Sequence, residues 1–159
     1  MKILLGCLSF RNFTGSEIYF YELSTAFKNA GHDVSIFSPF VDSPLKDKIN
    51  GINFPNPTEI NQENYDLVLF SHGKVIWEYI QNVKTKKLIN IIHSEVLDLE
   101  EPVLSDKVDL YVGIRPSIVQ HIIDKTSCSS REVKLIYNPF DIKRFNPQRC
   151  KKKKSIKEK

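Results

Sequence analysis

Cysteine, glycine and long apolar runs are all scarce in this sequence. Its three cysteines lie at positions 7, 128 and 150, an odd number without Cys-x-x-Cys spacing, which argues against a disulfide framework or a zinc site. No stretch approaches the roughly 18 apolar residues of a membrane span. The apolar run that opens the chain ends at Ser9, too early for a signal peptide. We therefore expect a cytoplasmic protein.

The motifs of several enzyme classes are absent as well. Gly15 is the only glycine in the first expected strand-to-helix turn, and no Gly-x-Gly-x-x-Gly occurs. Binding of NAD or FAD is therefore not expected, and a nucleotide-dependent oxidoreductase is kept only as a third hypothesis. The sequence has no Gly-x-Ser-x-Gly and no acidic cluster with metal-ligand spacing, which argues against a serine nucleophile and a metal cofactor.

The formal net charge of +4 comes from one end of the chain. Residues 151–159 contain six of the 23 basic side chains and one of the 19 acidic ones, which leaves 17 basic and 18 acidic side chains in residues 1–150. The body lacks the positive face that binding to a phosphate backbone needs, so no nucleic-acid partner is expected. We predict one domain over residues 1–147 and a basic, disordered tail over residues 148–159, with contact to an anionic membrane as the alternative role of this tail.

Apolar runs alternate with helical patterns along the chain. The patterns predict strands at residues 2–9, 33–38, 67–70, 87–92, 110–114 and 133–137, and helices at residues 14–30, 76–83 and 116–123. Residues 39–64 hold several prolines and predict an irregular connection with one short strand near Ile52. Such alternation predicts right-handed crossovers and an α/β fold, a Rossmann-like three-layer sandwich with a mainly parallel sheet.

Polar residues follow the expected strands at the edge where parallel sheets bind ligands. His72 and His93 follow two of these strands, and Arg115 and Asn138 follow two more. Two histidines on one edge suit either a functional or a structural role. His32 and His121 lie away from this edge and are expected to be structural.

The first strand-to-helix turn is the other candidate. Residues 14–17, Thr14-Gly15-Ser16-Glu17, have the form of a capping box. The free N–H groups and the dipole of a helix start would favour an anion there. On its own this turn is either a helix cap or a phosphate cradle.

Three passages resemble the amino-terminal domain of the retaining GT-B glycosyltransferases of family four. The first is the opening strand with the turn at residues 14–17 and the Gly-His-Asp-Val return at residues 31–34. The second is the pair of strands that end in His72 and His93. The third is residues 133–147, which are similar to the passage that leads into the second domain of that family.

The resemblance implies roles for these residues. It assigns His93 to contact with the transferred sugar, as the catalytic residue, and it places Thr14, Gly15, Ser16 and Glu17 near the donor phosphates and the acceptor. His72 and Asn138 are the further substrate-binding candidates, and the position of Arg115 suits contact with a phosphate. The substrates implied are a nucleotide sugar and an unknown acceptor, with no cofactor or metal.

Two departures from the family pattern bear on activity. Thr14 stands where the family has a glycine, and Pro139-Phe140 replace Gly-Val. The donor-binding second domain of the family is absent from this sequence, so we expect transfer to need a carboxy-terminal half, supplied in trans or by a longer product. The alternative is a non-catalytic binding or partner module, or a truncated remnant.

Overall fold

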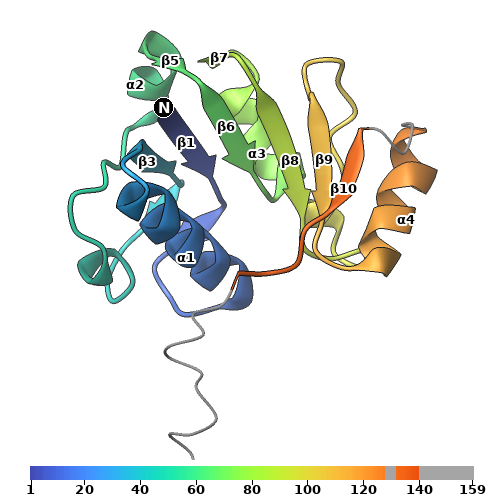
Figure 1. Cartoon of the computed structure of the whole chain (residues 1–159), viewed down its shortest axis with the longest axis horizontal. Coiled ribbons are helices and arrows are strands. Elements are labelled where there is room, and N and C mark those ends of the chain that lie inside the picture. Colours follow the sequence, from blue (N-terminus) through green and yellow to red (C-terminus); the bar gives the residue numbers. More distant parts are fainter. Residues whose placement is uncertain (128–131, 140–159) are drawn as a thin grey trace, which may run out of the picture.

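The computed structural model describes residues 1–127 and 132–139, and a six-stranded sheet forms its centre (Figure 1). The strands are β1 (Lys2–Gly6), β3 (Asp33–Phe37), β6 (Leu67–Phe70), β8 (Leu88–Ile92), β9 (Leu110–Gly113) and β10 (Val133–Leu135). They lie in the order β10-β9-β8-β6-β1-β3, and every pair is parallel. The predicted fold class, a Rossmann-like layered sandwich with a parallel sheet, is confirmed.

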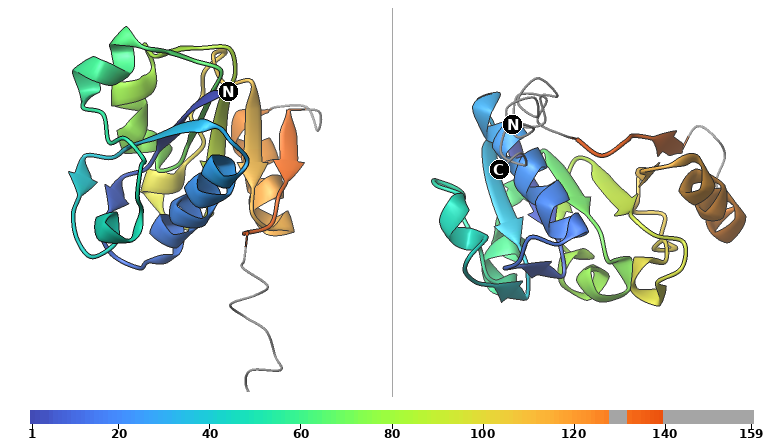
Figure 2. Two further views of the ribbon diagram at one scale, coloured as in Figure 1. Left: turned by 60° about the vertical axis from the view of Figure 1, so that its left-hand side comes forward. Right: turned by 90° about the horizontal axis from the view of Figure 1, so that it is seen from below.

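Helices cover both faces of this sheet. The helices are α1 (Gly15–Asn29), α2 (Pro57–Gln62), α3 (Gly73–Ile80) and α4 (Pro116–Thr126). On one face, Phe20 of α1 packs in the core with Ile3 and Leu5 of β1. Leu4 points the other way, as the period of two in a strand requires, and packs in the core with residues of α2 and α3. Figure 2 shows α1 on the opposite side of the sheet from α3 and α4.

The helix ends follow the signals in the sequence. Thr14 caps α1 in a capping box with Glu17, as predicted. Gly31 has φ 81° directly after that helix, a left-handed conformation that glycine adopts without steric cost. Pro116 occupies the first turn of α4, where its missing N–H loses no hydrogen bond.

Residues 39–64 are more regular than the sequence suggests. They contain a short strand β4 (Phe40–Val41), which pairs with β2 (Ser9–Phe10), then the 3₁₀ turn η1 (Lys46–Lys48), α2 and β5 (Asn64–Tyr65), which pairs with β7 (Lys84–Thr85). The strand expected near Ile52 is only a single bridge between Ser35 and Asn53. The prediction missed α2, although Asn56 accepts hydrogen bonds from the N–H groups of Thr58 and Glu59 as an ordinary N-cap.

Two strands end at least two residues earlier than predicted. The first strand ends at Gly6, and the last ends at Leu135 rather than at residue 137. The passage from Phe140 to Pro147, the boundary at residue 147 and the basic tail lie outside the described residues.

The order of the strands defines where a ligand site should lie. The chain runs from β1 to β3 on one side of the sheet and then crosses back to β6 on the other side of β1. The crossovers therefore leave β1 and β6 in opposite directions, so the carboxyl ends of these two strands form the topological switch point of the sheet. Ligands of open α/β sheets bind at this switch point.

Candidate functional site

Four buried or half-buried polar residues gather beyond the carboxyl ends of β1, β6 and β8. We call them the switch-point cluster: Glu17, His72, His93 and Glu100. They come from the start of α1, the two strand ends and a 3₁₀ turn, η2 (Asp98–Glu100). Glu17, His72 and Glu100 are 2%, 8% and 3% exposed. Titratable side chains so deeply buried at a switch point mark this cluster as the candidate site.

The ring of His72 bridges the ends of β1 and β6 to η2. Its backbone is left-handed, with φ 55° and ψ 50°, at the N-cap of α3. The N–H of Leu8 lies 3.4 Å from Nδ1, the Ser71 hydroxyl oxygen lies 2.8 Å from the same atom, and Nε2 lies 3.2 Å from a Glu100 carboxyl oxygen. Because a backbone N–H can only donate, Nδ1 accepts, and the ring proton sits on Nε2 and points to Glu100.

The Glu100 carboxyl group joins the two histidine segments. One of its oxygens faces His72, and the other accepts a hydrogen bond from the backbone N–H of His93 at 3.4 Å. Burial raises the pKa of Glu100 to about 7, and burial lowers the pKa of His72 to about 4. Both shifts oppose an ion pair, so the contact is a hydrogen bond from a neutral imidazole rather than a salt bridge.

His93 has a buried ring nitrogen without a partner. Its ring packs edge-on against Tyr19 of α1, with centroids 4.7 Å apart. Burial, and then the neighbouring His72, lower the pKa of His93 to about 4. Among the described residues no group hydrogen-bonds its Nε2. A buried polar atom left unpaired costs about 1–3 kcal/mol, so this nitrogen would gain from a hydrogen bond to any hydroxyl that reached it.

Glu17 organises the turn between β1 and α1. Its carboxylate accepts hydrogen bonds from the hydroxyls of Ser9 and Thr14, at 2.6 and 2.8 Å, and from the N–H groups of Arg11 and Thr14, at 3.1 and 3.2 Å. Burial alone would raise the pKa of Glu17, but these hydrogen bonds outweigh it and hold the pKa below its ordinary value. Two N–H groups of the turn are thus already occupied, while Thr14 and Gly15 are exposed and Ser16 is half-buried.

The other two candidates lie further along the sheet edge. Arg115 caps α4, and its guanidinium lies 2.6 Å from a carboxylate oxygen of Glu95. The Ser117 hydroxyl donates to the other oxygen of Glu95 at 3.3 Å. Asn138 is exposed beyond β10, in a segment that runs towards α1 (Figure 1). The structure thus brings together Glu17, His72 and His93 and leaves Arg115 paired with Glu95.

Sequence reasoning missed Glu100 and Glu95. Glu100 lies in the segment Asp98-Leu-Glu-Glu101-Pro102, where nothing in the spacing separates it from its exposed neighbour Glu101. Its burial depends on η2 folding back over the start of α3. A usable signal was the Ser71-His72-Gly73 sequence, because Gly73 permits that close approach.

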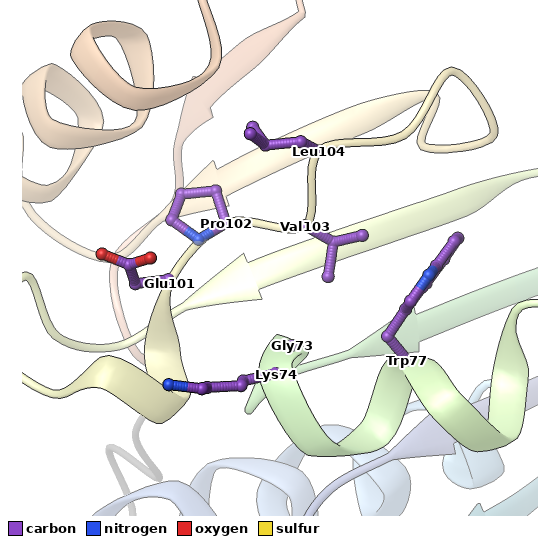
Figure 3. Close-up of a pocket in the computed structure, with 7 residues that line it drawn as sticks. All are labelled: Gly73, Lys74, Trp77, Glu101, Pro102, Val103 and Leu104. Atoms are coloured by element: carbon purple, nitrogen blue, oxygen red, sulfur yellow. The ribbon is translucent and has the colours of Figure 1, made fainter.

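Figure 3 shows the contact between α3 and the segment after η2. A Cβ atom on Gly73 would come within 2.9 Å of the Glu101 carbonyl oxygen and 2.7 Å of Val103 Cγ2, so only glycine fits there. A cavity of about 340 Å³ opens beside this contact, lined by Gly73, Lys74, Trp77, Glu101, Pro102, Val103 and Leu104. None of the switch-point cluster lines it.

Residues 1–127 and 132–139 lack two further features. Within these ranges no helix is long and apolar enough to cross a membrane. The same ranges contain no group of three histidine, cysteine or carboxylate side chains that could hold a metal ion.

Replacing Glu100 by glutamine should change how stability depends on pH. Folding raises the pKa of Glu100 from 4.5 to about 7. The contribution of Glu100 to the free energy of unfolding is therefore fully present below pH 4.5 and is lost as the pH rises through about 7. The lowered pKa values of His72 and His93 act in the opposite sense, since their contribution is lost as the pH falls from 6.5 through about 4. The wild type should therefore lose about 1–3 kcal/mol relative to Glu100→Gln between about pH 5 and pH 8.

Urea unfolding at several pH values measures this difference. Glu101→Gln is the matched control, because Glu101 is adjacent and exposed and pairs with Lys125 at 2.9 Å. The difference in the free energy of unfolding between Glu101→Gln and the wild type should stay constant between about pH 5 and pH 8. A pH-independent difference between the wild type and Glu100→Gln would contradict the raised pKa.

Comparison with known proteins supports the fold. Neither a protein family nor a curated protein sequence matches the chain. A solved structure, the apo form of the lipopolysaccharide outer core galactosyltransferase WaaB, is similar with a TM-score of 0.67 and 15% sequence identity. The match covers 89% of this chain and 47% of the galactosyltransferase. The chain thus has the fold expected of an amino-terminal GT-B domain and spans about half the length of the enzyme that it matches.

Proposed function

We propose that this chain is the acceptor-side domain of a GT-B glycosyltransferase and contributes to sugar transfer from a nucleotide sugar to an acceptor. The observation that carries the proposal is the unpartnered, buried Nε2 of His93, which lies at the switch point of a sheet with the fold of a galactosyltransferase domain. Because the chain spans about half of that enzyme, the donor-binding half and the activity of the whole are part of the proposal.

The cluster supports distinct roles for its residues. A neutral His93 can hydrogen-bond a sugar hydroxyl without adding a charge to the site. His72 and Glu100 hold the ends of β6 and β8 together, so they position His93 rather than touch the substrate. The first turn of α1, at residues 14–16, presents its positive dipole end, which can stabilise the departing nucleotide diphosphate. Arg115, further along the same sheet edge, can offer a positive charge to a phosphate if Glu95 releases it.

The experiment joins this chain to a carboxy-terminal GT-B half, taken from the gene that encodes or adjoins it. We expect the chain alone to show little or no transfer from UDP-galactose or UDP-glucose, and the joined or mixed halves to transfer sugar. The proposal would be wrong if the mixed halves did not associate and if neither the mixed nor the fused halves transferred sugar from any common nucleotide sugar.

A non-catalytic binding module is the second candidate, and the pairing of charges favours it. Glu95 already neutralises Arg115, and Glu17 already accepts from the N–H groups of Arg11 and Thr14, in the segment before α1. Both arrangements are expected if these residues stabilise the fold at this edge of the sheet and bind no substrate. The two candidates differ in whether the side chain of His93 is needed.

A further inference from the structure

A second cavity lies at the carboxyl end of β3, the edge strand of the sheet. It has a volume of about 470 Å³. It is bordered by the segment after β3, by the start of α2 and by Tyr79 near the end of α3. Its walls are mostly apolar and include Phe37, Val41, Phe54 and Tyr79. None of the switch-point cluster lines it. A volume of this size is within the range of about 300–1,000 Å³ found for small-molecule sites.

The walls of this cavity are held in place by packing and capping. The rings of Phe37 and Tyr79 lie 5.1 Å apart, and Phe54 packs against the buried Phe10 at 5.6 Å. Asn56, at the rim, is fixed because its side chain caps α2 at 2.9 and 3.0 Å. A preformed apolar site avoids the entropic cost of ordering side chains when a ligand binds.

One lysine gives the cavity its charge. Lys46 lines it, with Nζ 5.9 Å from the centroid of the Phe54 ring. Within the described part of the chain, no carboxylate forms an ion pair with Lys46. The carboxylates of its own segment, Asp42 and Asp47, accept hydrogen bonds from Ser43 at 2.8 and 2.6 Å. Lys46 is therefore a cation beside aromatic walls and is available to an anion.

We propose that this cavity binds a small anion that carries an aromatic ring or a short apolar chain. The apolar part packs against Phe54, Tyr79 and Val41, and the anionic group meets the ammonium of Lys46. Aromatic walls next to a cation fit this class better than a neutral sugar or a bare phosphate, because each of those satisfies only one part of the site. The site does not depend on the function proposed above.

Phenyl phosphate tests the proposal, with benzyl alcohol as the ring without the anion and inorganic phosphate as the anion without the ring. Each probe is titrated into the ¹⁵N-labelled full chain, and amide chemical shifts are followed. Phenyl phosphate should move the amide signals of non-proline residues at the cavity, namely Phe37, Ser38, Val41, Phe54, Asn56 and Tyr79. It should bind at least about fivefold more tightly than either partial probe. Lys46→Met should weaken its binding about three- to tenfold.

Lys48→Met is the matched control, because Lys48 belongs to the same exposed 3₁₀ turn but does not line the cavity. It should bind phenyl phosphate like the wild type. The absence of shifts, shifts centred elsewhere, benzyl alcohol binding as tightly, or an equal loss in both lysine variants would each overturn the proposal. Since the readout is binding and not transfer, failure here leaves the glycosyltransferase proposal untouched.

Discussion

The Glu17→Ala variant should be about 2–4 kcal/mol less stable than the wild type. The substitution removes one buried carboxylate that accepts hydrogen bonds from Ser9, Arg11 and Thr14. Each lost partner costs about 1 kcal/mol, and more where water cannot replace it. The same loss should loosen the turn before α1 and thereby the contact of Tyr19 with His93.

Urea unfolding followed by circular dichroism measures this change, and Glu59→Ala is its control. Glu59 makes a similar capping-box bond to the N–H of Asn56, at 2.7 Å, but on the exposed start of α2. Its loss should cost only about 0.5–1 kcal/mol. If the two variants were equally destabilised, burial would not be what makes Glu17 important.

The His93→Ala variant of the joined glycosyltransferase should lose about a hundredfold in kcat/KM for sugar transfer. Within the described switch-point cluster, the imidazole of His93 has a buried nitrogen that lacks a partner. Under the proposed function, its removal deletes a hydrogen bond to the substrate. His93→Gln keeps a hydrogen-bonding group and should retain part of the rate. Initial-rate assays with the preferred nucleotide sugar give the comparison.

His32→Ala provides the matched control. His32 precedes β3 at the opposite edge of the sheet, where its ring lies 6.0 Å from Phe27, and its loss should leave the rate unchanged. Circular dichroism of each variant separates loss of contact from loss of fold. Full transfer by a folded His93→Ala enzyme would instead favour the non-catalytic binding module.

The fold could be read from the sequence because each main element carries a local signal. Only a few consecutive residues are needed to recognise the apolar runs of β1 and β6 and the capping box of Thr14. The same holds for Pro116 at the start of α4. The α2 helix carried such a signal too, in Asn56 and Glu59, but the surrounding prolines concealed it.

The candidate site was predictable only in part, because its chemistry depends on contacts between distant segments. The positions of His72 and His93 at strand ends followed from the topology. That Glu100 is buried between them follows only from the packing of Val103 and the Glu101 backbone over Gly73. The pairing of Arg115 with Glu95 likewise joins residues 20 positions apart, which no local pattern reveals.

The Arg115 and Glu95 pair has a consequence for selectivity. An anion that binds Arg115 competes with a carboxylate held at 2.6 Å and supported by Ser117. When a singly charged anion replaces the Glu95 carboxylate at Arg115, one ion pair replaces another and the net binding energy is small. A phosphate with two charges and three acceptor oxygens gains more from the same exchange. If Arg115 binds the donor phosphates as proposed, competition from Glu95 would favour a diphosphate over singly charged carboxylates.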